Sequence, residues 1–238
     1  MLISFLFKRK NIWSIVQNPD DLEELIRCNL VVKNRTRMIP GSGVDTSLFK
    51  PSGFPDDRKP VVLFASRLLK NKGINEFVES ARIVKNKNIL AKFIIVGDVD
   101  KGNPTSIDTN NLKRWTIEGL VEWWGYREHM PEIINMAHII CLPSWREGIP
   151  KILLEAAASG RPIVSTDVPG CRDIVKHGEN GLLVPARDSN ALAEAIARLI
   201  LDKNLRIKMG EAGRKLIISK YTVAMINGQT LDLYRQLI

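Results

Sequence analysis

From Pro60 onward, short runs of β-branched and other apolar residues alternate with segments whose apolar residues recur at helical spacing. This alternation is typical of strand–helix units that build a parallel sheet covered by helices. Helical spacing is clearest in residues 74–86 and 191–202, and Asp188 or Ser189 can cap the second of these helices. The pattern therefore predicts an α/β fold with six strands, at residues 61–66, 91–97, 121–125, 138–143, 162–167 and 181–185.

The sequence before Pro60 follows a different pattern. Residues 12–17 and 36–40 are expected to form short strands, and a helix with acidic residues in its first turn is expected to begin at Pro19. Residues 41–59 are turn-rich and aperiodic, which is typical of a linker. Because residues 1–40 are too few for a domain, we expect them to be the end of a larger N-terminal domain.

The charge balance points to an anionic partner. The chain has 35 Lys+Arg against 26 Asp+Glu, a net charge of +9, which suits a phosphate-bearing small molecule, an anionic lipid or a nucleic acid. Its small basic clusters, at residues 8–10 and 33–37, are not interleaved with stacking aromatic residues, so we expect no nucleic-acid binding. The histidines and cysteines form no metal-ligand pattern, and the cysteines are expected to be buried as small apolar side chains.

The N-terminal run "MLISFLF" is apolar but far too short to span a bilayer, and it lacks the order of charge, apolar core and cleavage site of a signal peptide. The sequence therefore predicts a cytoplasmic protein.

Several polar residues follow the ends of the predicted strands. In an open parallel sheet, ligands bind at the carboxyl ends of the strands, where loops meet the N-termini of helices. Arg67 and Lys72 follow the first strand of this domain, Tyr126 and Arg127 follow the third, and Glu147 follows the fourth. We expect these side chains to converge at one edge of the sheet.

The helix expected at Pro150 begins without a capping side chain, because the residues ahead of it are Gly148 and Ile149. An uncapped N-terminus offers free backbone amides and the positive end of the helix dipole to an anion such as a diphosphate. Arg67 and Lys72 would add full positive charges. The alternative is that these two cations are solvated loop residues.

Glu155 stands in an apolar helical run, so a buried carboxylate there requires hydrogen-bond donors such as vicinal sugar hydroxyls. Glu147, just ahead of the helix, could hold a second sugar in the same way. The alternative is a surface ion pair between Lys151 and Glu155, four residues apart.

Asp98 and Asp100 suggest a third possibility. They follow a strand and could hold Mg²⁺ or Mn²⁺ under a diphosphate, as in metal-dependent sugar transferases. The surrounding residues, "GDVDKGNPTS", also suit a solvated turn.

Taken together, the segments between Gln17 and Tyr221 resemble the donor half of retaining glycosyltransferases of family 4, which have the two-domain GT-B architecture and elongate bacterial surface polysaccharides. The resemblance rests on "QNPDD", "IPGSGVDTSLF", "SRLLKNKGINEFVESA", "GDVDKGNP", "VEWWGYRE", "LPSWREGIPKILLEAAASGRPIVSTDVPGCRDIV" and "GENGLLVPARD". It implies that residues 60–221 form a Rossmann-like domain that binds a nucleotide-sugar donor, and that the helix at residues 222–238 crosses back toward an N-terminal domain that is largely absent.

The resemblance also implies roles for site residues. Glu147 and Glu155 match the two glutamates that this family spaces seven residues apart. Arg67 and Lys72 would hold the donor diphosphate and stabilise the charge that grows on it, Glu155 would bind the ribose and Glu147 the donor sugar. Backbone amides at Gly148, Ile149 and Lys151 would help to hold the sugar and the phosphate. The loop with Tyr126 and Arg127 would line the pocket for the base.

Such enzymes need no metal and no cofactor beyond the nucleotide sugar, here expected to be a UDP-sugar. The acceptor would be a saccharide or a polyprenyl-diphosphate-linked glycan, with peripheral contact at the inner face of the plasma membrane. Because the acceptor half is absent, we expect weak or no transfer by this chain alone. The chain is then a fragment, a split-gene product that needs a partner chain to supply the N-terminal domain, or a remnant. The alternative is a nucleotide-sugar-binding fragment or subunit without catalysis.

Overall fold

The computed structural model describes residues 7, 9, 11–56 and 58–237. Residues 1–6 of the apolar N-terminal run, and two residues of the basic cluster at 8–10, lie outside this described part. The predicted parallel sheet is confirmed: six strands pair in the order β5-β4-β3-β6-β7-β8, and every pairing is parallel. Their bounds are β3 Val61–Ala65, β4 Lys92–Val96, β5 Glu122–Trp123, β6 Ile139–Leu142, β7 Ile163–Thr166 and β8 Gly181–Val184.

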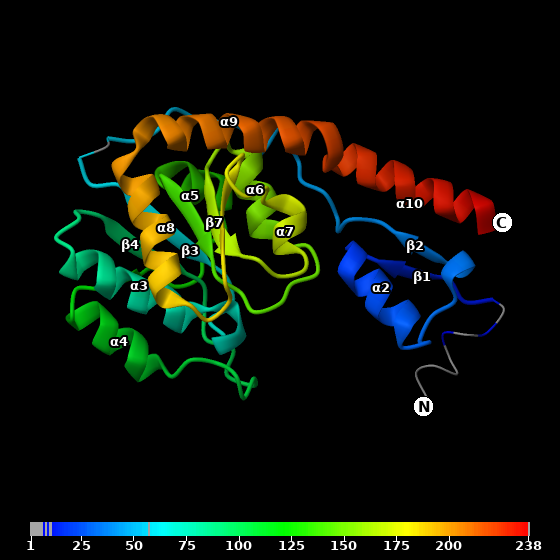
Figure 1. Ribbon diagram of the computed structural model, residues 1–238, viewed down its shortest axis with the longest axis horizontal. Helices are drawn as coiled ribbons and strands as arrows, with labels where there is room; N and C mark the ends of the chain where they lie inside the picture. Colours follow the sequence, from blue (N-terminus) through cyan, green and yellow to red (C-terminus); the bar gives the residue numbers. More distant parts are fainter. Residues whose placement is uncertain (1–6, 8, 10, 57, 238) are drawn as a thin grey trace.

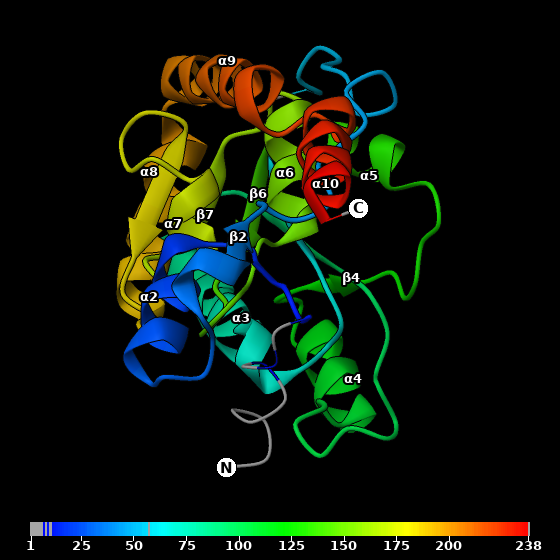
Figure 2. The same cartoon turned by 90° about the vertical axis from the view of Figure 1, so that its right-hand side faces the viewer.

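Helices connect these strands and cover the sheet, which makes the fold Rossmann-like (Figure 1). Helix α8 lies on one side of the central strands and α6 on the other (Figure 2). Asp188 caps α8, as predicted, by accepting a hydrogen bond from the Ala191 amide at 2.9 Å. The helices are α3 Ile74–Asn86, α4 Thr109–Ile117, α5 Met130–Met136, α6 Lys151–Ala158, α7 Cys171–Ile174, α8 Ser189–Leu201, α9 Lys203–Lys220 and α10 Val223–Leu237, with a single turn of 3-10 helix, η2, at Lys70–Lys72.

The central strands are buried on both faces, which explains why apolar residues predominate in them. All four residues of β6 and of β7 are buried, as are the last four of β3 and of β4. Phe64 of β3 contacts Phe77 of α3 with ring centroids 5.4 Å apart, and Phe77 contacts Phe93 of β4 at the same distance. These contacts fix α3 on the sheet and so fix the loop that precedes it.

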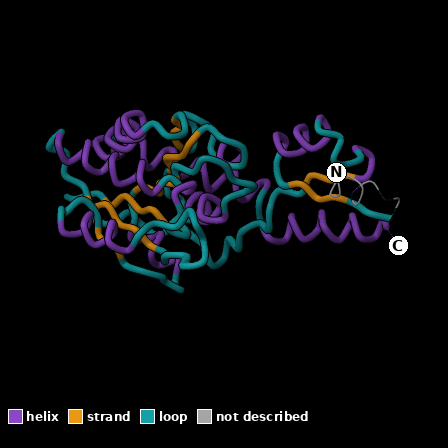
Figure 3. The backbone as a smooth tube through the Cα atoms, turned by 90° about the horizontal axis from the view of Figure 1, so that it is seen from below, coloured by secondary structure: helices purple, strands orange, loops and turns teal. Residues whose placement is uncertain are grey.

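The N-terminal part forms a smaller lobe (Figures 1 and 3). Its two short strands, β1 Ser14–Val16 and β2 Thr36–Met38, pair in parallel, and α2 Pro19–Arg27 and a 3-10 turn η1 at Lys33–Arg35 connect them. Helix α10 packs on this lobe, because its buried Ile226 and Leu233 cluster with Ile39 and the partly buried Trp13. The C-terminal helix and the N-terminal segment therefore lie side by side although they come from opposite ends of the chain (Figure 3).

Candidate functional site

Strands β3 and β6 are neighbours at the centre of the sheet, and the order of the strands reverses between them. At such a switch point the loops after the two strands run to opposite sides, which leaves a crevice for a ligand. The loop after β3 carries Arg67 and Lys72, and the loop after β6 carries Glu147 and Gly148. The two loops that hold most of the predicted site residues thus flank the switch point.

These two loops pack directly on each other. Gly73 has a φ of 77°, and a side chain there would place its Cβ 2.0 Å from the carbonyl oxygen of Pro143. Only glycine permits both this conformation and this approach of the two backbones. Two positions from this contact in each loop, the amide of Trp145 donates to the carbonyl of Asn71 at 3.0 Å. The backbone contacts bring the residues that follow into reach of each other.

Lys72 and Glu147 form an ion pair across the switch point. The ammonium nitrogen of Lys72 lies 2.6 Å and 2.8 Å from the two carboxylate oxygens of Glu147. The hydroxyl of the buried Ser144 donates to the same carboxylate at 2.7 Å. Both charged side chains are mostly buried, with exposed fractions of 17% and 11%. Lys72 is therefore not the solvated loop cation of the alternative interpretation.

Trp145, two residues before Glu147, is held in place by contacts on two sides of its ring. Its indole N–H donates to a carboxylate oxygen of Glu76 at 3.0 Å, and the Arg187 guanidinium lies 4.1 Å from the centre of its ring. Sequence reasoning did not single out Trp145, because nothing in its local pattern shows that α3 and the loop before α8 come together at it.

Four of the other predicted residues line a hollow of about 450 Å³ at the same edge of the sheet: Arg67, Tyr126, Arg127 and Glu155. Arg67 is two-thirds exposed, and its guanidinium lies 3.5 Å from the carboxylate of Asp100. Tyr126 is also exposed, so its ring is available at the rim. The hollow offers an exposed cation, an aromatic ring and an acidic group in one place.

Glu155 is buried inside α6, with 7% of its surface exposed. Burial raises the pKa of its carboxyl group, because the charged form loses solvation, and the positive charge of Lys151 works in the opposite direction. The Lys151 ammonium lies 3.5 Å from the carboxylate. The ion pair of the alternative interpretation is thus present, but its acidic member is a buried group rather than a surface one.

Helix α6 begins without a side-chain cap. Pro150 is the N-cap residue, not the first helical residue as the sequence predicted, and no side chain accepts a hydrogen bond from the first turn. Within the described part of the chain, no acceptor is found for the amides of Gly148, Ile149 and Lys151. This end of α6 therefore presents unpaired amides together with the positive end of the helix dipole.

A second hollow, of about 770 Å³, lies between the loop after β6 and the N-terminal lobe. Glu147 and Gly148 line one side of it, and Gln17 and Asp21 line the other. Arg146 connects the two sides, donating to Asp21 and to Glu24 at 2.7 Å each.

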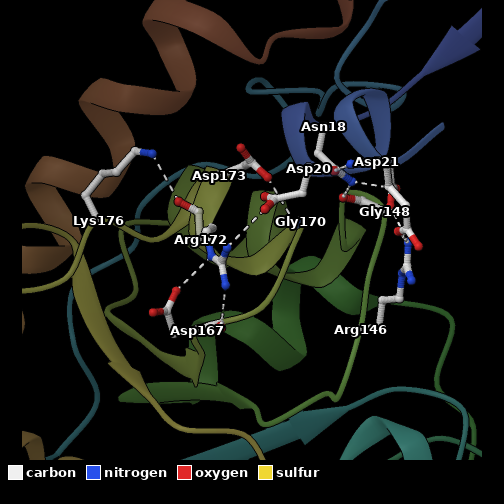
Figure 4. A network of polar contacts seen from close by, with 11 residues as sticks. Asn18, Asp20, Asp21, Arg146, Gly148, Asp167, Gly170, Arg172, Asp173 and Lys176 are labelled. Carbon is white, nitrogen blue, oxygen red and sulfur yellow. Dashed lines mark hydrogen bonds and ion pairs between the residues drawn. The ribbon is translucent and has the colours of Figure 1, made fainter. Parts of the chain in front are cut away.

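The contacts of Arg146 and the neighbouring contacts of Asn18 appear in Figure 4. Sequence reasoning missed both residues. Each lies more than 120 positions from its partner in the chain, and the acidic first turn of α2 was the only local signal.

The described residues contain no group of three or more His, Cys, Asp or Glu side chains that could hold a metal ion. Of the two aspartates considered for a metal, Asp100 faces Arg67. Cys141 and Cys171 are buried as predicted, whereas Cys28 is exposed, which corrects the prediction for that residue. None of the helices in the described part combines the length and the apolar character that crossing a membrane requires.

Comparison with known proteins gives the family. Residues 59–202, more than half of the chain, match the family model described as "Glycosyl transferases group 1". An N,N'-diacetylbacillosaminyl-diphospho-undecaprenol alpha-1,3-N-acetylgalactosaminyltransferase from Campylobacter jejuni is 34% identical over 182 residues, which are 76% of this chain and 46% of that protein. The chain thus spans about half the length of this relative.

Solved structures extend the likeness to the whole fold. Sucrose-phosphate synthase from Thermosynechococcus elongatus superimposes with a TM-score of 0.82 at 28% identity, over 94% of this chain and 57% of that one. Anabaena HepE, solved in complex with UDP and glucose, gives a TM-score of 0.83 at 22% identity, over 98% of this chain and 65% of that one. The chain therefore belongs to the group 1 glycosyltransferases, and its α/β sheet domain is the C-terminal half of their two-domain GT-B architecture.

Proposed function

We propose that this chain supplies the donor-binding half of a retaining glycosyltransferase that transfers a hexosyl or other glycosyl group from a nucleotide-diphospho-sugar. The observation that carries the proposal is the ion pair of Lys72 and Glu147 at the switch point, beside the uncapped N-terminus of α6. A diphosphate placed there would meet the cation, the unpaired amides and the helix dipole together.

In this proposal each predicted residue has a part. Arg67 and Lys72 bind the diphosphate, and they stabilise it as the bond between the sugar and the diphosphate breaks and the bonding electrons pass to the leaving oxygen. The acceptor hydroxyl attacks the same carbon from the face that the diphosphate leaves, so the configuration is retained, and its proton passes to the departing diphosphate oxygen. Glu147 contacts the donor sugar, and Glu155 accepts hydrogen bonds from the ribose hydroxyls. Tyr126 and Arg127 contact the base of the nucleotide, and the backbone amides at Gly148, Ile149 and Lys151 contact the sugar and the phosphate.

The pairing of Lys72 with Glu147 fits this mechanism. Before the donor binds, each charge neutralises the other in a mostly buried place, where an isolated charge would be costly. When a diphosphate arrives, Lys72 can turn one of its three N–H donors to it and keep a bond to Glu147. With Lys72 on the diphosphate and Glu147 on the sugar, the pair would fix the position of the donor sugar relative to its diphosphate.

UDP-sugar is the proposed donor, because the similar Anabaena structure holds UDP and glucose. A saccharide or polyprenyl-diphosphate-linked acceptor is proposed from the name of the Campylobacter relative, a diphospho-undecaprenol transferase. Such an acceptor would bring the protein to the inner face of the plasma membrane, where anionic lipid attracts positive charge. No metal and no further cofactor are part of the proposed reaction.

The proposed division of the chain is residues 1–40 as the end of an N-terminal domain, 41–59 as linker, 60–221 as donor-binding domain and 222–238 as crossing helix. The chain spans about half the length of the Campylobacter relative. The proposed enzyme therefore also includes an acceptor domain, in the same polypeptide or in a partner chain. The alternative function is a nucleotide-sugar-binding subunit without catalysis.

Thermal shift with a panel of UDP-, GDP- and ADP-sugars tests the donor proposal, because a ligand of the folded state raises its melting temperature. We expect stabilisation by UDP-sugars, and no stabilisation by any of the three would contradict the proposal. A transfer assay with lipid-linked acceptors then separates enzyme from binding subunit: robust turnover by the isolated chain would remove the need for a partner.

A further inference from the structure

Asn18 lies in the turn between β1 and α2 and is completely buried. Its side-chain oxygen caps α2 by accepting from the Asp21 amide at 2.8 Å. Its side-chain nitrogen donates in two directions, to the Asp21 carboxylate at 2.8 Å and to the carbonyl of Gly148 at 3.0 Å (Figure 4). A residue of the N-terminal lobe thus binds the backbone of the proposed donor loop.

The carbonyl of Gly148 is confined from other sides as well. Gly170 has a φ of 77°, and a Cβ on it would lie 2.1 Å from this carbonyl oxygen, so the backbone before α7 packs directly against it. The side-chain oxygen of Gln17 occupies the space 2.5 Å from where a Cβ of Gly148 would stand. The peptide group between Gly148 and Ile149 is therefore held in one orientation.

A peptide group is planar, and in the trans form its C=O and N–H point in opposite directions. The described chain contains no cis peptide bond, so fixing the Gly148 carbonyl also fixes the direction of the Ile149 N–H. That N–H has no acceptor among the described residues. We propose that Asn18 is a positioning residue of the donor site: by holding the Gly148 carbonyl, it aims the Ile149 N–H at an oxygen of the nucleotide sugar. This inference rests on the proposed function for the identity of the ligand.

Arg146 holds the same loop by a different kind of contact. Its side chain is 59% exposed, and its partners Asp21 and Glu24 are partly exposed as well. Exposed ion pairs contribute little, whereas a closely packed carbonyl such as that of Gly148 is costly to leave without its donor. Replacing Asn18 therefore tests whether the orientation of the loop depends on it, while the ion pairs of Arg146 still attach the loop to the N-terminal lobe.

The variant Asn18→Ser makes this separation. Serine caps helices as well as asparagine does, so α2 keeps its cap, but its shorter side chain carries no donor that reaches Gly148. Asp202→Ser is the matched control, since Asp202 caps α9 by accepting from the Leu205 amide at 2.8 Å and belongs to neither of the two loops of the proposed donor site. Two quantities are measured on the full chain: the NMR order parameter of the Ile149 amide without nucleotide, and the UDP affinity by calorimetry.

We expect the Ile149 order parameter to fall from about 0.85 to below about 0.6 in Asn18→Ser, the change from a rigid to a flexible backbone. UDP should bind about 3- to 10-fold more weakly, the ratio for one lost neutral hydrogen bond. Asp202→Ser should change neither quantity. An unchanged order parameter, or a lowered one with unchanged UDP affinity, would overturn the inference.

The two proposals can fail separately in this experiment. If the unaltered chain binds no UDP, the proposed function fails and the donor role of Asn18 fails with it. The order parameter then still decides whether Asn18 holds the Gly148–Ile149 peptide.

Discussion

The ammonium of Lys72 lies 2.6 Å from the carboxylate of Glu147, although 75 positions separate the two residues in the chain. The pair joins the loop after β3 to the loop after β6 at the point where the order of the strands reverses. A cation and an acid that sequence reasoning assigned to different parts of one ligand are thus already in contact. Changes to this pair and to the groups around it should therefore alter both donor binding and stability.

Lys72→Ala should weaken UDP affinity by about 1.5–3 kcal/mol, because it removes a charged hydrogen-bond partner of the diphosphate. It should also lower thermal stability, since among the described residues Glu147 would keep the Ser144 hydroxyl alone as a hydrogen-bond partner in a mostly buried place. Calorimetric titration with UDP measures the first effect. Lys113→Ala, at an exposed position of α4, is the control and should leave the affinity unchanged. Equal affinities for the two variants would contradict the proposed contact of Lys72 with the diphosphate and leave its ion pair with Glu147 a structural one.

Glu155→Gln should raise stability at neutral pH while it weakens UDP binding. Burial raises the pKa of Glu155 above its ordinary value of 4.5, so the folded protein keeps this proton at pH values where the unfolded chain has lost it. Stability therefore falls as the pH rises from 4.5 through the raised pKa. The variant should lack this part of the slope and should therefore melt at a higher temperature than the parent at pH 7.

Melting curves between pH 4 and pH 8, at matched ionic strength, measure the slope for Glu155→Gln. A variant that melts lower than the parent at pH 7 would contradict this prediction, because it would mean that the ionised carboxylate stabilises the fold through Lys151.

Gly170→Ala should displace the loop after β6, on which the backbone at Gly170 packs. The backbone at Gly170 is in the left-handed region, and the added methyl group would meet the carbonyl oxygens of Gly148 and Glu147 at 2.1 and 2.7 Å. We expect a loss of about 2 kcal/mol or more in the free energy of unfolding and a weaker affinity for UDP. Gly102→Ala is the control, because a Cβ there has no neighbour within 4 Å. Denaturant unfolding of the two variants compares them directly, and similar midpoints would contradict the close packing of Gly170 on the loop.

UDP binding should survive EDTA. In the proposed site the charges on the diphosphate are met by Arg67, Lys72 and backbone amides, so a chelator removes nothing that the ligand needs. Titrations with EDTA and with added Mn²⁺ should agree within error. An affinity that rises with Mn²⁺, and loses that rise in Asp98→Asn, would favour the metal-dependent alternative.

Much of the fold could be predicted from local patterns. Strands β3 and β6 are continuous apolar runs because both of their faces are buried, and such runs between helical segments indicate a parallel sheet. The edge of the sheet that carries the site followed from the same reasoning, since loops after parallel strands share one edge. Arg67 and Tyr126 were therefore expected at one edge, and they line one hollow.

The contacts that set the geometry of the site could not be predicted in this way. The bond from Asn18 to Gly148 spans 130 positions, and neither residue has a pattern that names the other. The start of α6 also lies one residue later than predicted, because Pro150 takes an extended conformation with a ψ of 116° and acts as the cap residue. The Asn18–Gly148 contact and the first residue of α6 depend on long-range packing between parts of the chain. The local spacing of apolar residues carries no information about such packing.

A crystal structure of the chain with UDP tests the proposed donor site most directly. We predict the diphosphate at the switch point between β3 and β6, with oxygens about 3 Å from the Lys72 ammonium, the Arg67 guanidinium and an amide at the start of α6. A diphosphate bound elsewhere on the fold, with the ion pair of Lys72 and Glu147 untouched, would contradict the proposal.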